Sequence, residues 1–95
     1  MMVSLESYPL RSEELVWRVI EDEIVILTSD GREIHTLNKV GGSIWEMADG
    51  TMSLDDIASK ICDLFDVSLE TAREDVIEFA KELSDKNILN IKDSR

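Results

Sequence analysis

The chain has 95 residues, and ten Lys and Arg against 21 Asp and Glu give it a formal net charge of −11. This length suits one domain rather than two, and the charge argues against nucleic-acid binding, because phosphates must be neutralised by basic side chains. A single cysteine excludes an internal disulfide, and the longest aliphatic run, residues 24–27, is too short to span a bilayer. The N-terminus also lacks the pattern of a signal peptide, so we expect a cytoplasmic protein without membrane contact.

The two ends of the chain show little structural pattern. Residues 1–12 have no clear period, and Pro9 indicates an extended, turn-prone lead-in. The polar tail KDSR at 92–95 is expected to fray. We therefore expect one domain over residues 1–95, with its core at about 14–91 and flexible ends at 1–12 and 92–95.

Three consecutive strands are predicted over residues 14–37. The segment ELVWRVI at 14–20 alternates in the manner of a strand, and IVILT at 24–28 is a β-branched run typical of a central strand. Asp-Gly at 30–31 is a strong hairpin signal, after which EIHTL at 33–37 returns as a third strand. The order predicts an antiparallel meander whose third strand keeps one unpaired edge.

The pattern then changes to a helical period. A first helix is expected after Asn38, a favourable N-cap, and its end is expected at the turn dipeptide Asp49-Gly50. Gly41 and Gly42 near its start each cost about 1 kcal/mol relative to alanine inside a helix. We therefore expect this helix to approach its neighbours too closely for side chains at these two positions.

Two longer helices follow, with serine N-caps at Ser53 and Ser68 and apolar stripes suited to packing against a core. The segment NILNI at 87–91 is predicted to form a short terminal strand. The expected fold class is thus α+β: a three-stranded antiparallel sheet, then a three-helix bundle with a short C-terminal wing strand. In outline this is similar to a winged helix-turn-helix.

An ordered set of residues in this arrangement resembles the PqqD family over about residues 14–91. The set comprises Leu37-Asn38, Ile44-Trp45, Asp49-Gly50, Ile57, Asp75-Val76, Phe79 and Leu83. The resemblance implies an element that recognises the leader segment of a ribosomally made, post-translationally modified peptide (RiPP) and presents it to a modifying enzyme, often a radical-SAM enzyme. The PqqD protein itself serves pyrroloquinoline quinone (PQQ) biosynthesis, whereas KVGGSIW at 39–45 looks closer to stand-alone elements of other peptide pathways.

The resemblance also implies where the peptide binds. In the family the leader is added as a strand beside the third strand, in a groove against the third helix, which is a known mode of peptide recognition. The expected strand residues are Glu33, Ile34, His35, Thr36 and Leu37. On the helix, the flank expected to face the peptide comprises Arg73, Ile77, Ala80 and Lys81. The alternative is that Ile77 only widens the core stripe and that the two cations balance an acidic helix.

Nothing in the sequence predicts an enzyme, a cofactor or a metal site. Cys62 and His35 are the only candidates for a nucleophile–base pair, and we interpret them as a structural thiol and a strand residue. The carboxylates are dispersed and lack calcium-loop spacing, and too few N or S ligands are present for zinc. Trp17 and Trp45 are expected in the core.

Two other functions remain open at this point. One is a winged-helix DNA-binding regulator, although residues 69–86 are net acidic where a recognition helix should be basic. The other is a protein-interaction or dimerisation module that uses the same open strand edge, which would make the chain a homodimer.

Overall fold

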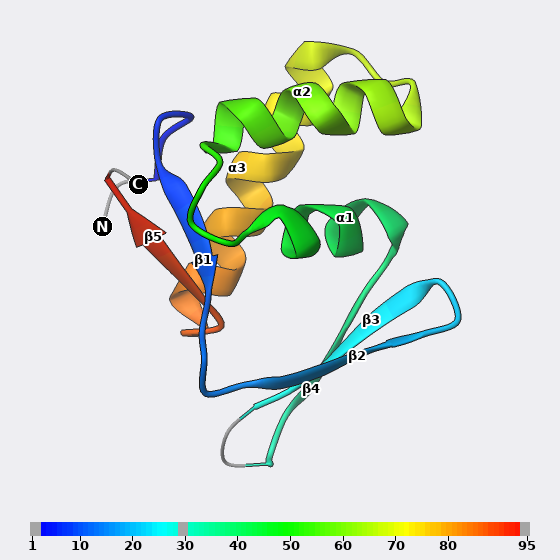
Figure 1. The fold of residues 1–95 in the computed structure, drawn as a ribbon, viewed down its shortest axis with the longest axis vertical. Coiled ribbons are helices and arrows are strands. Elements are labelled where there is room, and N and C mark those ends of the chain that lie inside the picture. Colours follow the sequence, from blue (N-terminus) through cyan, green and yellow to red (C-terminus); the bar gives the residue numbers. More distant parts are fainter. Residues whose placement is uncertain (1–2, 29–30, 94–95) are drawn as a thin grey trace.

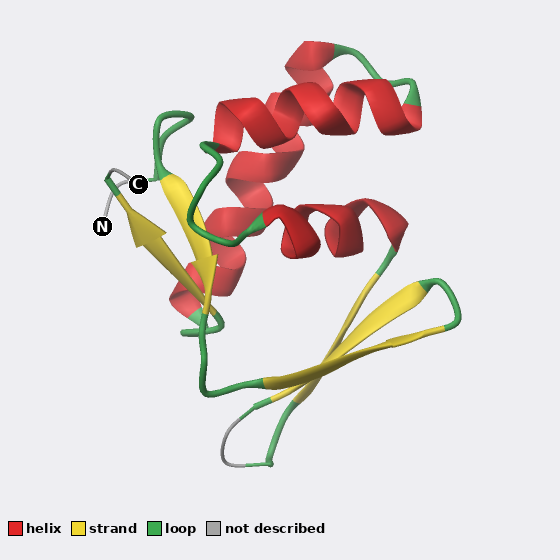
Figure 2. Cartoon of the chain, viewed as in Figure 1, coloured by secondary structure: helices red, strands yellow, loops and turns green. Residues whose placement is uncertain are grey.

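The computed structural model describes residues 3–28 and 31–93. Five strands and three helices follow one another, with the helices grouped on one side of a three-stranded sheet (Figures 1 and 2). Their bounds are β1 Tyr8–Arg11, β2 Val16–Ile20, β3 Glu23–Leu27, β4 Ile34–Leu37, α1 Lys39–Met47, α2 Leu54–Phe65, α3 Leu69–Asp85 and β5 Leu89–Lys92. None of the helices in the described part of the chain combines the length and apolar character that a membrane span requires.

The predicted meander is confirmed: β2, β3 and β4 form an antiparallel sheet in that order. A two-residue turn joins β2 to β3, with Glu21 at a φ of 58°. The predicted Asp-Gly turn falls partly on residues 29 and 30, which lie outside the described residues, and Gly31 after them has a φ of 70°. Ile24 and Ile26 of the central strand are buried under the helices.

The terminal strand is not a lone wing, which corrects the expected sheet arrangement. β5 pairs antiparallel with β1 in a second, two-stranded sheet, with Pro9 opposite Ile91. Residues 1–12 show no clear period in the sequence, and β1 is therefore an element that the sequence pattern does not predict. The ends expected to be flexible lie partly outside the described residues, and within them residues 8–11 form β1.

The N-terminal segment also completes the start of α2. The carbonyls of Leu5 and Ser7 accept the backbone N–H groups of Asp55 and Leu54, both at 2.9 Å. The first N–H groups of a helix have no partner within it, so these bonds satisfy two of them. Ser7 is accordingly buried.

The predicted caps are confirmed at all three helices. The side chains of Asn38, Ser53 and Ser68 accept hydrogen bonds from the backbone N–H three residues ahead. The end of α1 differs slightly from the prediction: the helix stops at Met47, Ala48 is the C-cap, and Gly50 turns the chain with a φ of 85°. Trp45 is fully buried in the core, and Trp17 is half-buried with its ring edge-on to Trp45.

The close approach predicted for the two glycines is confirmed. A Cβ atom at Gly42 would lie 3.3 Å from Cδ1 of Ile24 in β3. A Cβ atom at Gly41 would lie 3.3 Å from Cε2 of Phe79 in α3. The start of α1 therefore lies close to β3 on one side and to Phe79 of α3 on the other.

Candidate functional site

The outer side of β4 is an open sheet edge. β4 pairs with β3 on one side, and no strand among the described residues pairs with its other side. Both chain termini lead into the separate β1–β5 sheet, so neither covers this edge in the part of the chain that the structure describes. Such an edge presents unpaired backbone N–H and C=O groups to another chain.

The hydrogen bonding of β4 fixes which backbone groups face outward. Thr28 donates its N–H to the carbonyl of Glu33, directly opposite, at 3.1 Å. Directly opposed pairs alternate between hydrogen-bonded and non-hydrogen-bonded along an antiparallel ladder. His35 and Leu37 therefore bond to β3, while the N–H and C=O groups of Ile34 and Thr36 point to the open edge.

A groove of about 370 Å³ runs between β4 and the second half of α3. Its strand side comprises Ile34, His35, Thr36 and Leu37, continued by Asn38 and Gly41, and its helix side comprises Phe79, Glu82, Leu83 and Lys86. Leu37, Phe79 and Leu83 supply apolar surface, and the first two are only partly buried. The groove thus combines free backbone groups with apolar side chains along one edge.

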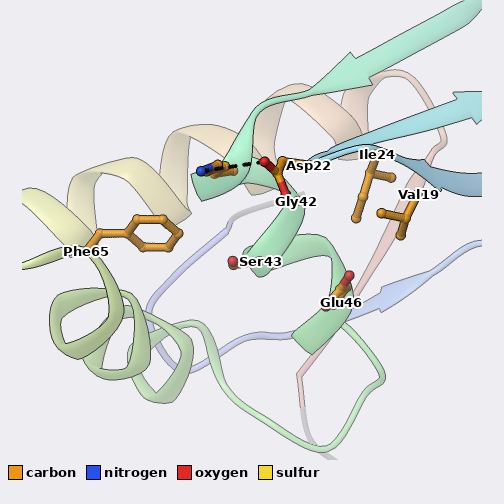
Figure 3. Close-up of a pocket in the computed structure, with 8 residues that line it drawn as sticks. Val19, Asp22, Ile24, Gly42, Ser43, Glu46 and Phe65 are labelled. Atoms are coloured by element: carbon orange, nitrogen blue, oxygen red, sulfur yellow. Dashed lines mark ion pairs between the residues drawn. The ribbon is translucent and has the colours of Figure 1, made fainter.

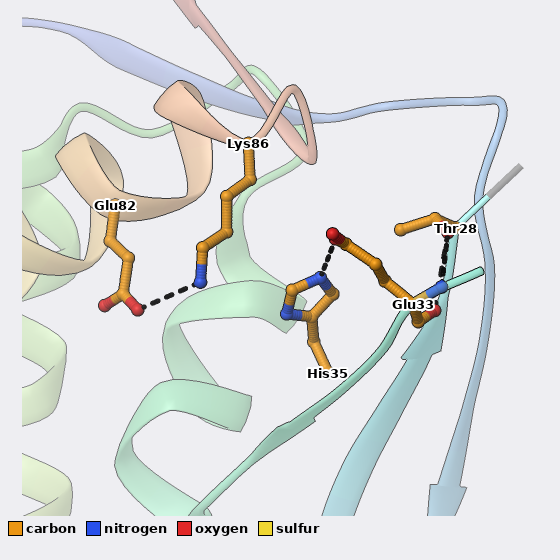
Figure 4. Close-up of polar contacts among 5 residues, drawn as sticks. All are labelled: Thr28, Glu33, His35, Glu82 and Lys86. Atoms are coloured by element: carbon orange, nitrogen blue, oxygen red, sulfur yellow. Dashed lines mark hydrogen bonds and ion pairs between the residues drawn. The ribbon is translucent and has the colours of Figure 1, made fainter. Parts of the chain in front are cut away.

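Four polar side chains at the groove form two contacts, a histidine–carboxylate hydrogen bond and an ion pair (Figure 4). Nε2 of His35 lies 3.1 Å from Oε2 of Glu33 on the strand side, and Nζ of Lys86 lies 3.3 Å from Oε1 of Glu82 on the helix side. The Glu33, Glu82 and Lys86 side chains are all more than two-fifths exposed. Exposed pairs of this kind contribute little to stability, so these side chains are free to exchange partners with a ligand.

The helical residues predicted from sequence do not line this groove. Ala80 is fully buried in the core, and Ile77 is half-buried against it. Arg73 donates from Nε to Oδ1 of Asp55 in α2 at 2.9 Å, while Lys81 is exposed. Because α2 packs along this side of α3, the flank that faces β4 is the opposite one, with Phe79, Glu82 and Lys86. The helix sequence holds no signal that distinguishes the two flanks, since the choice depends on where α2 packs.

A second, smaller hollow of about 190 Å³ lies at the other end of the sheet (Figure 3). It is lined by the β2–β3 hairpin, α1 and Phe65 at the end of α2, and Lys39 and Asp22 approach within 3.8 Å beside it. It contains none of the residues predicted for the site and no part of the β4 edge.

The two residues considered as a nucleophile–base pair have other partners. Cys62 donates its S–H to the carbonyl of Val67 at 2.9 Å, and His35 pairs with Glu33 on β4. Across residues 3–28 and 31–93, no three His, Cys, Asp or Glu side chains form a cluster that could hold a metal ion. What the β4 edge can offer is binding of an extended chain.

Comparison with solved structures finds two similar chains. TbiB1, solved in complex with the TbiA(beta) leader peptide, has a TM-score of 0.77 and 27% sequence identity, with 85% of this chain and 94% of that chain covered. The PqqD truncation of Methylobacterium extorquens PqqCD, described as a functional and stand-alone RiPP recognition element, has a TM-score of 0.78 and 18% identity, with 94% and 95% covered. The latter likeness shows the fold alone. A comparison with curated protein sequences gave no match.

The sequence profile of Coenzyme PQQ synthesis protein D (PqqD) matches residues 23–89, which run from the first residue of β3 to the first residue of β5. The match includes both walls of the groove. It covers well over half of the chain and confirms the resemblance seen in the sequence. The chain therefore belongs to the PqqD family.

Proposed function

We propose that this chain is a non-catalytic adaptor that binds the leader segment of a ribosomally made precursor peptide and presents it to a modifying enzyme. The observation that carries the proposal is the open edge of β4 beside a groove with apolar walls. The similar chain TbiB1 was solved with a leader peptide bound, which supports the same role here.

In this proposal the leader lies along β4 as a fourth strand of the sheet. The N–H and C=O groups of Ile34 and Thr36 offer four backbone hydrogen bonds. Every second side chain of the leader points into the groove, toward Leu37, Phe79 and Leu83. Glu33 and His35 complete the strand side. The polar groups on the helix side are Glu82 and Lys86, rather than the cations Arg73 and Lys81 expected from the sequence.

The expected affinity follows from these groups. Four backbone bonds contribute about 1 kcal/mol each, and two buried apolar anchors add about 1.5–3 kcal/mol each. Association and the ordering of a flexible leader offset a large part of this sum. The remainder corresponds to binding no tighter than roughly micromolar, which suits an adaptor that must release its peptide.

The enzyme partner belongs to this proposal as well. A radical-SAM enzyme or another peptide-modifying enzyme would receive the bound leader. The alternative of a DNA-binding regulator is disfavoured by the charge of α3 and its cap. Residues 69–86 are net acidic. They carry three basic side chains, Arg73, Lys81 and Lys86, and six acidic ones, Glu70, Glu74, Asp75, Glu78, Glu82 and Asp85. Edge-to-edge dimerisation remains the competing use of β4.

The test starts from a phage-displayed library of random twelve-residue peptides, selected on the immobilised chain. The tightest binder is synthesised and titrated into ¹⁵N-labelled protein. We expect shifts on β4 and on residues 79–86 of α3, and loss of binding when the peptide amides are N-methylated. Shifts on β2, which is the other outer strand of the same sheet, or binding that survives N-methylation would contradict the proposal.

A further inference from the structure

The face of the sheet turned away from the helices carries a row of exposed aliphatic side chains. Val16, Leu27 and Ile34 lie opposite one another on β2, β3 and β4. They are 58%, 37% and 68% exposed. Because side chains alternate between the faces of a sheet, the burial of Ile26 under the helices places Leu27, and with it the whole row, on the outer face.

This row ends at the open edge. Ile34 is its last member and is also the most exposed large hydrophobic residue in the described part of the chain. Its N–H and C=O groups point away from β3, so a strand added there bonds to Ile34 itself. The side chain that this strand places beside Ile34 must lie on the same outer face, since directly opposed residues of paired strands share a face.

The chemistry of the row defines what fits next to it. Its three members are aliphatic and include no charged or polar side chain, whereas the neighbouring row of Arg18, Val25 and Thr36 is mixed. Cross-strand pairs of β-branched residues with one another or with aromatic residues are among the favourable combinations in sheets. A solvated polar side chain beside Ile34 would leave the aliphatic surface exposed.

We propose that Ile34 forms a second specificity-determining subsite, which takes a β-branched or aromatic side chain of the added strand on the outer face of the sheet. The inference rests on the proposed function, because it needs a peptide strand on β4. It adds that the peptide is recognised on both of its faces. One set of alternate side chains enters the groove against α3, and at least one side chain of the opposite parity extends the row of Val16, Leu27 and Ile34.

The experiment is a positional scan of the synthetic peptide selected from the random library. Each position is replaced in turn by serine, and the dissociation constant is measured by fluorescence anisotropy on the wild-type chain, on Ile34→Thr and on Val16→Thr. Threonine keeps the β-branched shape at both positions. Val16 is the matched control because it lies in the same row but two strands away from the added peptide.

We expect serine to weaken binding at peptide positions of both alternating sets, the one whose side chains enter the groove and the one whose side chains lie on the outer face. Serine at the position beside Ile34 weakens binding about two- to fivefold on the wild-type chain and on Val16→Thr, but not on Ile34→Thr. A second result would be that serine weakens binding only at positions of one alternating set, while N-methylation of the peptide still abolishes binding. That result overturns this inference and leaves the proposed function standing. If N-methylation has no effect, both fall. A concentration-dependent dimer of the free wild-type chain that Ile34→Thr dissociates would assign the row to a second copy instead.

Discussion

Arg11 donates from Nη1 to the carbonyl of Trp45 at 2.8 Å, and from the same nitrogen to the carbonyl of Glu46 at 2.9 Å. Its guanidinium carbon also lies 5.5 Å from the centre of the Trp17 ring. Arg11 is the last residue of β1, Trp45 and Glu46 are near the end of α1, and Trp17 is in β2. One side chain therefore connects the small β1–β5 sheet to both the helices and the three-stranded sheet.

Replacing Arg11 by alanine should lower the free energy of unfolding by about 2 kcal/mol. The change removes charge-assisted hydrogen bonds to carbonyls at the negative end of α1 and a cation–π contact. Urea denaturation followed by tryptophan fluorescence measures the loss. Arg11→Lys keeps the charge but not the planar group, so its stability should lie between the two. A stability of Arg11→Ala equal to that of the wild type would contradict this role.

Replacing Gly42 by alanine should destabilise the chain by about 1 kcal/mol, although alanine is the better helix former. The added Cβ atom would lie 3.3 Å from Cδ1 of the buried Ile24, and overpacking costs about 1–3 kcal/mol against a gain in helix propensity of about 1 kcal/mol.

A double-mutant cycle with Ile24→Val tests the cause, because valine lacks the contacting Cδ1 atom. The two changes together should cost less than the sum of their separate effects in thermal unfolding. Additive costs would show that the contact with Ile24 does not cause the loss of stability in Gly42→Ala.

Peptide affinity should distinguish the two flanks of α3. Phe79→Ala removes an apolar wall of the groove and should weaken binding of the selected peptide about tenfold. Ile77→Ala is the matched control, because Ile77 is also half-buried, lies two residues away on the same helix and does not line the groove. It should change the dissociation constant less than about twofold.

Both dissociation constants are measured by calorimetry at a temperature where circular dichroism shows each variant folded. A larger loss of affinity in Ile77→Ala than in Phe79→Ala would contradict this site. It would indicate that the peptide contacts the flank of Arg73, Ile77, Ala80 and Lys81 instead.

The elements that were predicted correctly have local causes. Asn38, Ser53 and Ser68 cap their helices through hydrogen bonds three residues ahead, and the meander follows from alternation and a β-branched run. β1 could not be found in this way. Its partners are β5, some 80 residues away, and the turn after α1, where Gly50 donates to the carbonyl of Pro9.

The candidate site likewise has one side that follows from local sequence and one that depends on distant contacts. The open edge of residues 33–37 could be predicted because the order of strands in a meander leaves its first and third strands outermost. The choice of the third strand over the first comes from the resemblance to the PqqD family. The helix side could not be predicted, because periodicity gives the buried stripe of α3 but not the side on which α2 packs. The ion pair between Arg73 and Asp55 marks the side of α3 on which α2 packs, and it joins two helices.

The proposed function requires that the backbone edge of β4 is open in the free chain and paired when the peptide is bound. Amide hydrogen exchange measured by NMR tests it residue by residue. We expect the N–H groups of Ile34 and Thr36 to exchange fast in the free chain and to become protected at saturating selected peptide. Those of His35 and Leu37 should be protected in both states. Protection of Ile34 and Thr36 already in the free chain, or no gain in protection with peptide bound, would contradict it.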